Sequence, residues 1–337
     1  MIITKTPFRI SFFGGGTDYP EYFEGNGGGA VLGSSIEHSG FLSVSRFYSR
    51  LFDHKLRVTY RQVECVNSID EIQHSAFREC LRYCNVTEDV ELNYTAHLPS
   101  FSGVGSSSSF LVGLLHALHA YQGRPISPME LAYEAIALER GVLGECVGCQ
   151  DQTLAAVGGL NVVEFRTVQD IRVHPVPLSP ERREWLQAHL MMFHTGVSRR
   201  ASDVAARQVV RISENREILK RMRGMVDEAY KYLTDGFGLE RFGSLLDETW
   251  RMKQSLAQGI ADSRITEFYR MAREAGALGG KLAGAGGGGF LIFFVPPERQ
   301  AAVQLALTDL ECIPLRLGSF GTHVLHDSVE KGVAVTA

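Results

Sequence analysis

The sequence predicts an α+β protein of two domains. Its 337 residues are about twice a typical single-domain length. Alternating, strand-like stretches are interspersed with helical spacings, and the proline-rich segment 175–180 (PVPLSP) interrupts both patterns near the middle of the chain. We therefore expect one domain over residues 1–178 and a second over residues 179–337.

The first domain begins with strands. Residues 2–13 are β-rich and end at the glycines of segment 14–16, so they predict a strand that feeds a glycine loop. Helical spacing of Ile72, Phe77 and Leu81 predicts a helix over residues 69–83. Alternation predicts further strands over residues 41–47, 56–60, 90–96 and 160–165.

Three more helices are predicted in this half. The apolar run 110–121 follows directly on a serine-rich segment. Ser127 has the character of an N-cap and Pro128 that of the first helical residue, so a helix is expected from there to Arg140. A short helix is expected over residues 149–156.

The second half is mainly helical. The unbroken apolar run 290–295 (FLIFFV) predicts a buried strand. The remaining predicted elements are a strand over residues 190–193, a long helix over 198–233, two helices up to residue 275, a helix over 297–310 and a strand over 323–326.

Glycine carries most of the functional information. The 35 glycines are roughly a tenth of the chain, against a background of about 7%. Three tracts lie at residues 14–16, 103–105 and 276–289. The middle tract runs through four serines into an apolar helix, the arrangement in which backbone N–H groups and a helix N-terminus bind phosphate. Its serine hydroxyls suit phosphate or magnesium; the competing interpretation is a serine-rich linker.

Two common nucleotide-binding motifs are excluded. A Walker A loop fails because Leu282 follows Lys281 and Ala275 stands where the first glycine belongs. Residues 284–289 match G-x-G-x-x-G, but they precede a strand rather than a helix, which does not fit a dinucleotide fold.

Four charged residues near the glycine tracts are candidates for chemistry. Asp151 and Glu139 can hold magnesium or accept a proton from an attacking hydroxyl. Arg9 can stabilise a carboxylate or phosphoryl charge, and the short Asp18 suits sugar hydroxyls. The competing interpretations are solvated surface acids for the first pair and structural ion pairs for the second.

Weaker signals lie elsewhere. Arg199 and Arg200 follow a predicted strand and are candidates to hold a phosphorylated substrate, although a solvated helical face is the alternative. Cys146 and Cys149 form a single C-x-x-C without a second pair or a nearby histidine, so they predict buried thiols rather than a metal or redox site.

Charge and hydropathy bound the class. The 34 basic and 38 acidic side chains give a net charge of −4, which argues against a nucleic-acid binder. The sequence has neither an apolar run long enough for a membrane helix nor the pattern of a signal peptide. We expect a cytoplasmic protein with no membrane partner.

Taken in order, three segments resemble the motifs of the GHMP kinases: TPFRISFFGGGTD (6–18), PSFSGVGSSSSF (99–110) and KLAGAGGGGFLIF (281–293). In the second, Val104 replaces the usual leucine and Ser108 the usual alanine. The resemblance implies an N-terminal α/β domain with a mixed sheet and a ferredoxin-like C-terminal domain. The active site would lie in the cleft between them, with ATP and Mg²⁺ as cofactors.

The resemblance also implies residue roles. Asp151 would take the proton of the acceptor hydroxyl, with Arg9 beside it stabilising charge, and Ser107 and Glu139 would hold magnesium. The ATP-binding residues would be Gly103, Val104, Gly105, Ser106, Ser107 and Ser108. The substrate-binding residues would be Gly15, Gly16, Thr17, Asp18, Arg199, Gly286 and Gly287.

Within the family, the GGGTDYPEYF opening and the serine run are most similar to the branch that phosphorylates heptose 7-phosphates. This implies transfer from ATP to the anomeric hydroxyl of D-glycero-D-manno-heptose 7-phosphate, on the way to nucleotide-activated heptose for bacterial surface polysaccharide. The alternatives are an L-fucokinase or other sugar 1-kinase and a non-catalytic sugar sensor. The partners would be a sugar phosphate and a nucleotide, and the protein a monomer or homodimer.

Overall fold

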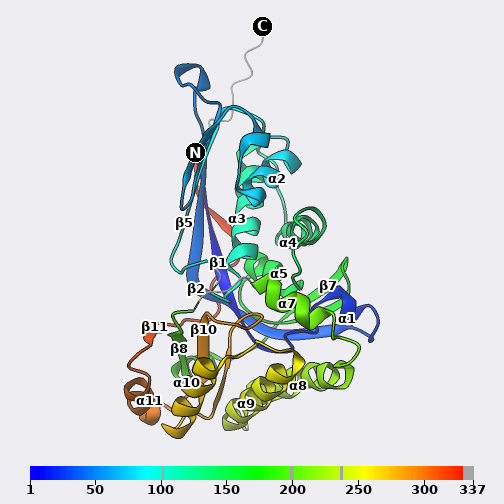
Figure 1. Cartoon of the computed structure of the whole chain (residues 1–337), viewed down its shortest axis with the longest axis vertical. Coiled ribbons are helices and arrows are strands. Elements are labelled where there is room, and N and C mark those ends of the chain that lie inside the picture. Colours follow the sequence, from blue (N-terminus) through cyan, green and yellow to red (C-terminus); the bar gives the residue numbers. More distant parts are fainter. Residues whose placement is uncertain (101, 198–200, 236–237, 329–337) are drawn as a thin grey trace.

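The computed structural model describes residues 1–100, 102–197, 201–235 and 238–328. The strands of this part of the chain form one sheet of eight strands and one of four. Figure 1 shows the two along the long axis of the molecule, with the larger sheet reaching into the narrow upper part and the smaller one in the broad lower part.

The larger sheet is mixed, as expected. Its order is β12-β1-β2-β5-β3-β4, with β6 also paired to β2 and β7 paired to β6. Every pair is antiparallel except β3 with β5. The strands are β1 (Ile2–Phe13), β2 (Gly29–Arg46), β3 (Leu56–Thr59), β4 (Val63–Val66), β5 (Val90–Ala96), β6 (Leu160–Thr167), β7 (Asp170–Pro175) and β12 (His323–Asp327).

The last strand returns to the first sheet. β12 pairs antiparallel with β1, so that Ile2 lies opposite Asp327 and Lys5 opposite His323. The predicted domains, 1–178 and 179–337, are each one continuous stretch of sequence. In space, however, β12 belongs to the sheet of the first half of the chain.

The smaller sheet has the strand order of a ferredoxin-like domain. β8 (Leu190–His194), β9 (Gly279–Leu282), β10 (Phe290–Phe294) and β11 (Glu311–Ile313) are arranged β11-β8-β10-β9, and each pair is antiparallel. The helices of this half are α6 (Pro180–Ala188), α7 (Ala201–Val209), α8 (Arg216–Thr234), α9 (Leu239–Leu256), α10 (Ser263–Glu274) and α11 (Gln300–Ala306). Helix α9 packs on β9, and α8 contacts both α9 and the strands β1 and β2, so α8 joins the two sheets.

Helices cover the larger sheet as well. α3 (Ser106–Tyr121) and α5 (Gln150–Val157) pack on β1 and β2. α2 (Ser75–Tyr83) and α4 (Pro128–Ala137) lie beside α3, and α1 (Pro20–Phe23) follows the first glycine loop. The predicted cap of α4 is confirmed, since Ser127 and Glu130 form a reciprocal capping box with Pro128 in the first turn.

Several predicted boundaries are wrong. The helix predicted over 69–83 begins only at Ser75, after a separate 3-10 turn at Ile69–Glu71. The long helix predicted over 198–233 is two helices, α7 and α8. Asn215 lies between them, just before α8, and its buried side chain donates to the Leu256 carbonyl at the end of α9. α3 starts at Ser106 rather than 110, because its first turn is serine and carries no apolar periodicity.

Short elements were not predicted. The strands β4, β7, β9 and β11 have three to six residues, and α6 begins at Pro180, the last residue of the segment taken for a boundary. β2 begins at Gly29, well before the strand predicted over 41–47. Its first half was not predicted, because it is rich in glycine and serine. Such segments become strands through their pairing partners rather than through their own propensity.

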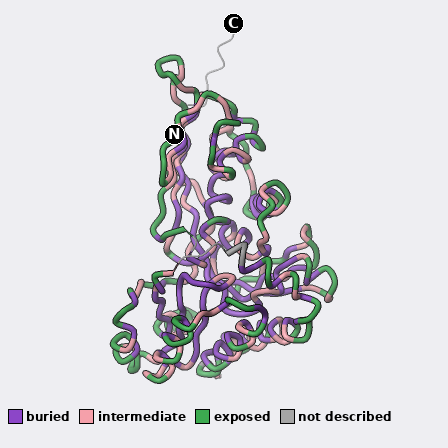
Figure 2. The backbone as a smooth tube through the Cα atoms, in the orientation of Figure 1, coloured by how far each residue is buried: buried purple, intermediate pink, exposed green. Residues whose placement is uncertain are grey.

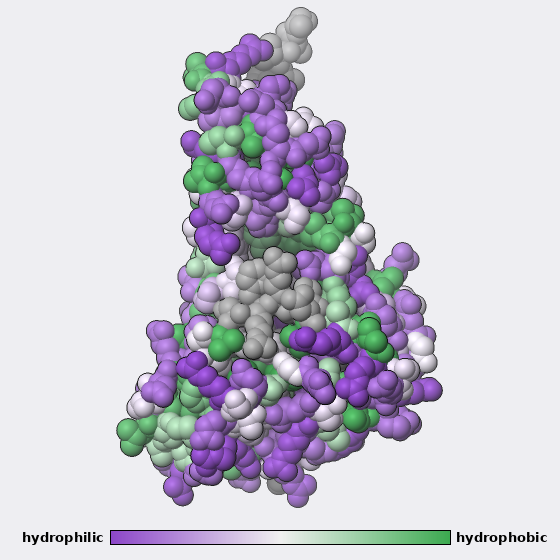
Figure 3. Space-filling model, viewed as in Figure 1, coloured by the Kyte–Doolittle hydropathy of each residue, from purple (hydrophilic) through white to green (hydrophobic). Residues whose placement is uncertain are grey.

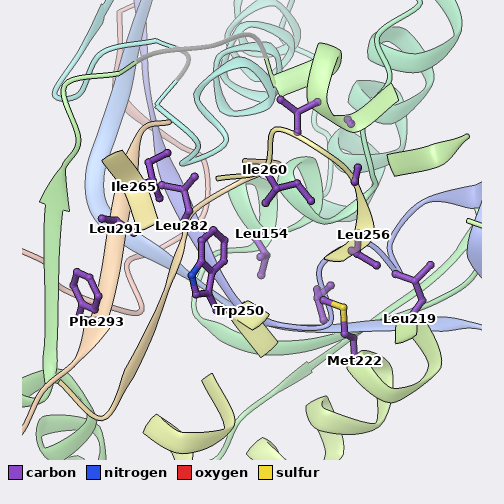
Figure 4. Packing of buried hydrophobic residues seen from close by; sticks show 14 of the residues in the cluster. Leu154, Leu219, Met222, Trp250, Leu256, Ile260, Ile265, Leu282, Leu291 and Phe293 are labelled. Carbon is purple, nitrogen blue, oxygen red and sulfur yellow. The ribbon is translucent and has the colours of Figure 1, made fainter. Parts of the chain in front are cut away.

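The two halves share their cores. One cluster of buried residues joins Leu154 of α5 to Trp250 of α9, Leu282 of β9 and Phe293 of β10 (Figure 4). Figure 2 shows buried segments continuing from the strands of the larger sheet into the lower part of the molecule. The orientation of the halves is therefore held by apolar packing, which fixes the geometry of the site between them.

Candidate active site

A cleft of about 1070 Å³ opens between the two halves. The residues that line it come from all three glycine segments and from α5 and α9. They include Arg9, Gly15, Gly16, Asp18, Gly103, Gly105, Ser106, Ser107, Ser108, Glu139, Asp151, Lys253, Lys281, Gly284 and Ala285.

The centre of the cleft is an ion pair between Arg9 of β1 and Asp151 in the first turn of α5. Arg9 Nε donates to Asp151 Oδ1 at 2.6 Å, and Nη2 donates to Oδ2 at 2.5 Å. The Arg9 side chain is 5% exposed and that of Asp151 is 20% exposed. The pair is thus bidentate and oriented, while the carboxylate remains accessible from the cleft.

Arg9 also holds the glycine loop that precedes α3. Its Nη1 donates to the Gly103 carbonyl at 2.7 Å, and its backbone N–H donates to the Val104 carbonyl at 3.0 Å. Gly105 has φ +70°, and a Cβ there would lie 3.1 Å from the Arg9 side chain. Only glycine allows both this backbone conformation and this approach. The loop therefore presents the free N–H groups of the α3 N-terminus to the cleft.

Glu139 is a buried carboxylate with a free oxygen. It lies in a π-helical turn, Leu138–Val142, that follows α4. Its Oε2 accepts from Ser108 Oγ at 2.7 Å and from Gln152 Nε2 at 2.6 Å, whereas Oε1 is buried without a partner in the described residues. Burial raises the pKa of Glu139 to about 7.

An unpartnered buried carboxylate oxygen beside the exposed Ser107 hydroxyl fits a magnesium ion. The described residues contain no group of three or more His, Cys, Asp and Glu side chains suited to a metal. This also fits magnesium, which takes one or two carboxylates from the protein and completes its coordination with water and substrate phosphates.

Asp18 lines the cleft near the ion pair, close enough for its charge to interact with that of Asp151. Its buried carboxylate accepts from the Gly16 N–H at 3.0 Å, and Gly148 leaves the space that it occupies. Burial and then the nearby Asp151 charge raise the pKa of Asp18. Thr17 does not line the cleft: its hydroxyl donates to the carbonyls of Gly14 and Ala30 and holds the loop in shape.

The third glycine tract lies mostly behind the cleft. Gly284 and Ala285 line it, but Gly286 packs on Ile260, and the Gly287 N–H donates to the Ile260 carbonyl at 2.9 Å. The structure thus places Gly286 and Gly287 outside the lining. Val104 is also buried away from it, and Arg199 and Arg200 lie outside the described residues.

Two buried lysines were missed by the sequence interpretation. Lys281 of β9 donates to the backbone carbonyls of Ser11 at 2.7 Å and Phe12 at 3.2 Å. Lys253 of α9 donates to the Gly284 carbonyl. Burial lowers the pKa of both, that of Lys253 to about 8. Nothing in the sequence marks Lys253, because lysine in an amphipathic helix normally indicates the solvent face. Lys281 begins the third motif segment, but no role was predicted for its side chain.

Aromatic side chains line the far end of the cleft. Tyr94 and His74 both pack on Phe110, with ring centroids 4.8 and 5.3 Å apart, and Tyr60 packs on His74 at 4.7 Å. Burial lowers the pKa of His74, so this ring is neutral at pH 7. The cleft is therefore lined by a group of aromatic rings in addition to the charged side chains and the glycine loop.

A helix N-terminal glycine loop next to a carboxylate–arginine pair and a buried carboxylate defines a phosphotransferase site. The family model for the GHMP kinase N-terminal domain matches residues 71–159, and that for the GHMP kinase C-terminal domain matches residues 233–310. The chain belongs to the GHMP kinase family, and both the predicted family and its fold are confirmed.

The similarity to known proteins extends over most of the chain. It is 28% identical over 319 residues to a D-glycero-α-D-manno-heptose 7-phosphate kinase of Campylobacter jejuni, covering 91% of this chain and 93% of the relative. An L-fucokinase/L-fucose-1-P guanylyltransferase of Bacteroides fragilis is 25% identical, over 89% of this chain and 35% of the relative. The crystal structure of a D-glycero-D-manno-heptose 1-phosphate kinase from Bacteroides thetaiotaomicron matches with a TM-score of 0.79 at 21% identity, covering 98% and 100% of the two chains.

In the part of the chain that the structure describes, no helix is both long enough and apolar enough to cross a membrane. The face seen in Figure 3 carries mainly hydrophilic residues, with apolar ones scattered among them.

Proposed function

We propose that this GHMP kinase transfers the γ-phosphoryl group of ATP to the anomeric hydroxyl of D-glycero-D-manno-heptose 7-phosphate, forming the 1,7-bisphosphate and ADP. The observation that carries the reaction is the bidentate Arg9–Asp151 pair at the end of the α3 loop, open to the cleft. The choice of acceptor is supported by the Campylobacter relative, which matches nearly end to end.

Each part of ATP would have its own place in the cleft. The base would stack among Tyr94, His74 and Phe110, whose faces suit a purine. The phosphates would lie on the N–H groups of residues 103–108 at the start of α3, where the helix dipole favours negative charge. This direction puts the terminal phosphoryl group next to Asp151.

At the charged end, the acceptor hydroxyl would donate its proton to an Asp151 oxygen as its own oxygen bonds to the γ-phosphorus. The bond from that phosphorus to the β–γ bridging oxygen breaks, and ADP leaves. Arg9 fixes the orientation of the carboxylate and balances its charge throughout. Asp18, held by Gly16, would accept hydrogen bonds from sugar hydroxyls.

Magnesium would be held by Glu139 Oε1 and the Ser107 hydroxyl together with the nucleotide phosphates. When bound, it supplies neutralisation of the charge on the phosphates. Ser108 and Gln152 orient Glu139 for this task by occupying its other oxygen.

The experiment is an ADP-release assay with ATP and Mg²⁺, comparing D-glycero-D-manno-heptose 7-phosphate, sedoheptulose 7-phosphate, D-mannose, L-fucose and D-galactose. We expect kcat/KM to be highest for the heptose phosphate. Preference for a free sugar would overturn the acceptor and keep the kinase. ATP binding without turnover on any acceptor would favour a sugar sensor.

The second candidate is an L-fucokinase or another sugar 1-kinase, which the Bacteroides fragilis relative favours. Fucose carries no phosphate, so the two candidates differ in the need for a basic phosphate site. Arg199 stays a prediction for that site: Arg199→Ala should raise KM for a phosphorylated sugar more than for a free one. Equal changes would remove Arg199 from substrate binding.

A further inference from the structure

Lys253 is a buried cation inside the cleft with unused hydrogen-bonding capacity. It is 4% exposed, it lines the cleft, and the structure gives its ammonium group one hydrogen bond to the described residues, to the Gly284 carbonyl. An ammonium group has three N–H donors. A buried charge that leaves donors unused is costly unless something else binds there.

The other cations at this end are already engaged. Lys281 donates to two backbone carbonyls of β1. Arg9 donates to both oxygens of Asp151 and to the Gly103 carbonyl. Within the described residues, Lys281 thus makes two hydrogen bonds and the Arg9 side chain three, whereas Lys253 makes one.

The charges around Lys253 favour an anion. Lys253 interacts electrostatically with Arg9, Asp18 and Asp151, and Lys281 interacts with Lys253. Among these groups, three cations face two carboxylates, which leaves an excess of positive charge around Lys253. Because the Lys253 side chain is buried, water screens this charge little, and it attracts a negative group.

The position of Lys253 indicates which anion it would bind. Its partner Gly284 lies against Gly103 of the phosphate loop, where a Cβ on Gly284 would be 2.7 Å from the Gly103 Cα. Gly103 in turn accepts from Arg9, which holds Asp151. The ammonium group is thus tied to the junction between the phosphate loop and the proton acceptor.

We propose that Lys253 is a further catalytic residue, whose ammonium group binds the γ-phosphoryl group of the nucleotide and stabilises the charge on it during transfer. This inference rests on the proposed ATP-dependent reaction but not on the identity of the sugar. It assigns a cation from the second half of the chain to a reaction whose acid–base group comes from the first half.

The test compares the affinities of Mg-ADP and Mg-AMP-PNP by calorimetric titration, without any sugar. Lys253→Met should weaken AMP-PNP binding about tenfold or more, since a charge-assisted hydrogen bond is lost, and change ADP binding by less than about twofold. Lys253→Gln keeps a donor for the Gly284 carbonyl, removes the charge, and should show the same selective loss. The glutamine variant also provides the test if the methionine variant does not fold.

Two lysines serve as matched controls. Lys281→Met removes a buried lysine that donates to two backbone carbonyls of β1, so any change in affinity should be the same for the two nucleotides. The exposed Lys220→Met should change neither affinity.

An equal loss of ADP and AMP-PNP affinity in both Lys253 variants would overturn the proposal and leave Lys253 as a support for Gly284. Unchanged nucleotide affinity with a raised KM for the sugar phosphate would also overturn it, and would indicate that Lys253 binds the acceptor instead. Both results would leave the kinase function intact, whereas a wild-type protein that binds neither nucleotide would refute that function itself.

Discussion

The two walls of the cleft are built differently. The wall from the first half supplies the carboxylates Asp18, Glu139 and Asp151 and a phosphate loop with open N–H groups. The wall from the second half supplies the buried amines of Lys253 and Lys281 and a glycine tract that faces mainly protein. In the proposed reaction, the first wall would take part in proton transfer and metal binding, and the second would complete the charge balance of the site.

The glycines show the same contrast. Gly105 has a positive φ, and its backbone lies against the Arg9 side chain. Gly284, Gly286 and Gly289 have positive φ as well, but their backbones approach the backbones of Gly103, Ile260 and Ser102. Glycine therefore marks close approach in both tracts, to the central arginine in one and to protein backbone in the other.

The largest effect is expected on the first wall. Asp151→Asn should lower kcat by about 10²–10⁴, the usual contribution of a general base. The fold should survive, because the substitution keeps the shape of a partly exposed side chain. Steady-state kinetics and thermal unfolding measure the two effects.

The matched control for Asp151 is Asp170→Asn, which breaks a surface ion pair with Arg172 and should leave kcat unchanged. Near-normal turnover of the Asp151 variant would remove this residue from the mechanism and erase the contrast between the walls.

The second prediction concerns the stability cost of Lys253. Below its folded pKa of about 8 the amine is charged in both folded and unfolded states, and the folded state bears the cost of burial. Between pH 8 and the ordinary value of 10.5 the unfolded chain binds more protons, so wild-type stability rises with pH.

Lys253→Met should therefore be more stable than wild type at pH 7.5, and this advantage should shrink by about 3 kcal/mol by pH 10.5. Urea unfolding at several pH values measures it, with Lys220→Met as the exposed control. A difference that does not vary with pH would show that burying the amine costs nothing.

The third prediction probes the contact between the two glycine loops. Gly284→Ala places a Cβ 2.7 Å from the Gly103 Cα at φ +69°, and should lower the free energy of unfolding by about 1–3 kcal/mol. It should also weaken ATP binding, because the phosphate loop must shift.

Gly123→Ala is a close control, since Gly123 has the same φ of +69° but open space around it. Urea unfolding should give a smaller loss for Gly123→Ala, with unchanged nucleotide affinity. If both substitutions cost the same, only the backbone conformation matters and the loops do not support each other.

The smallest effect is expected for the metal. Glu139→Gln keeps the shape of the side chain but removes its charge, and should weaken metal binding to the nucleotide complex about tenfold. Titration of Mn²⁺ in the presence of ADP and the Mg²⁺ dependence of turnover both report it. The exposed Glu145→Gln, at the rim of the cleft, is the control, and unchanged metal affinity in the Glu139 variant would exclude Glu139 as a ligand.

The sequence by itself determined what local patterns encode. Alternation predicted β1, β5 and β6, the serine–proline signal predicted the start of α4, and the glycine tracts with Arg9, Asp18, Glu139 and Asp151 indicated a phosphate site and its family. These features depend on neighbouring residues, whose dihedral and hydrogen-bonding preferences act without the rest of the fold.

Only the tertiary structure decided how distant residues meet. It paired Arg9 with Asp151 across 142 positions, left one oxygen of Glu139 without a partner among the residues that the structure describes, and brought β12 back to β1. It also buried Lys253 in the cleft, which no pattern around that residue indicates. Burial and long-range pairing depend on how whole elements pack together, and that packing is a property of the assembled cores rather than of any one segment.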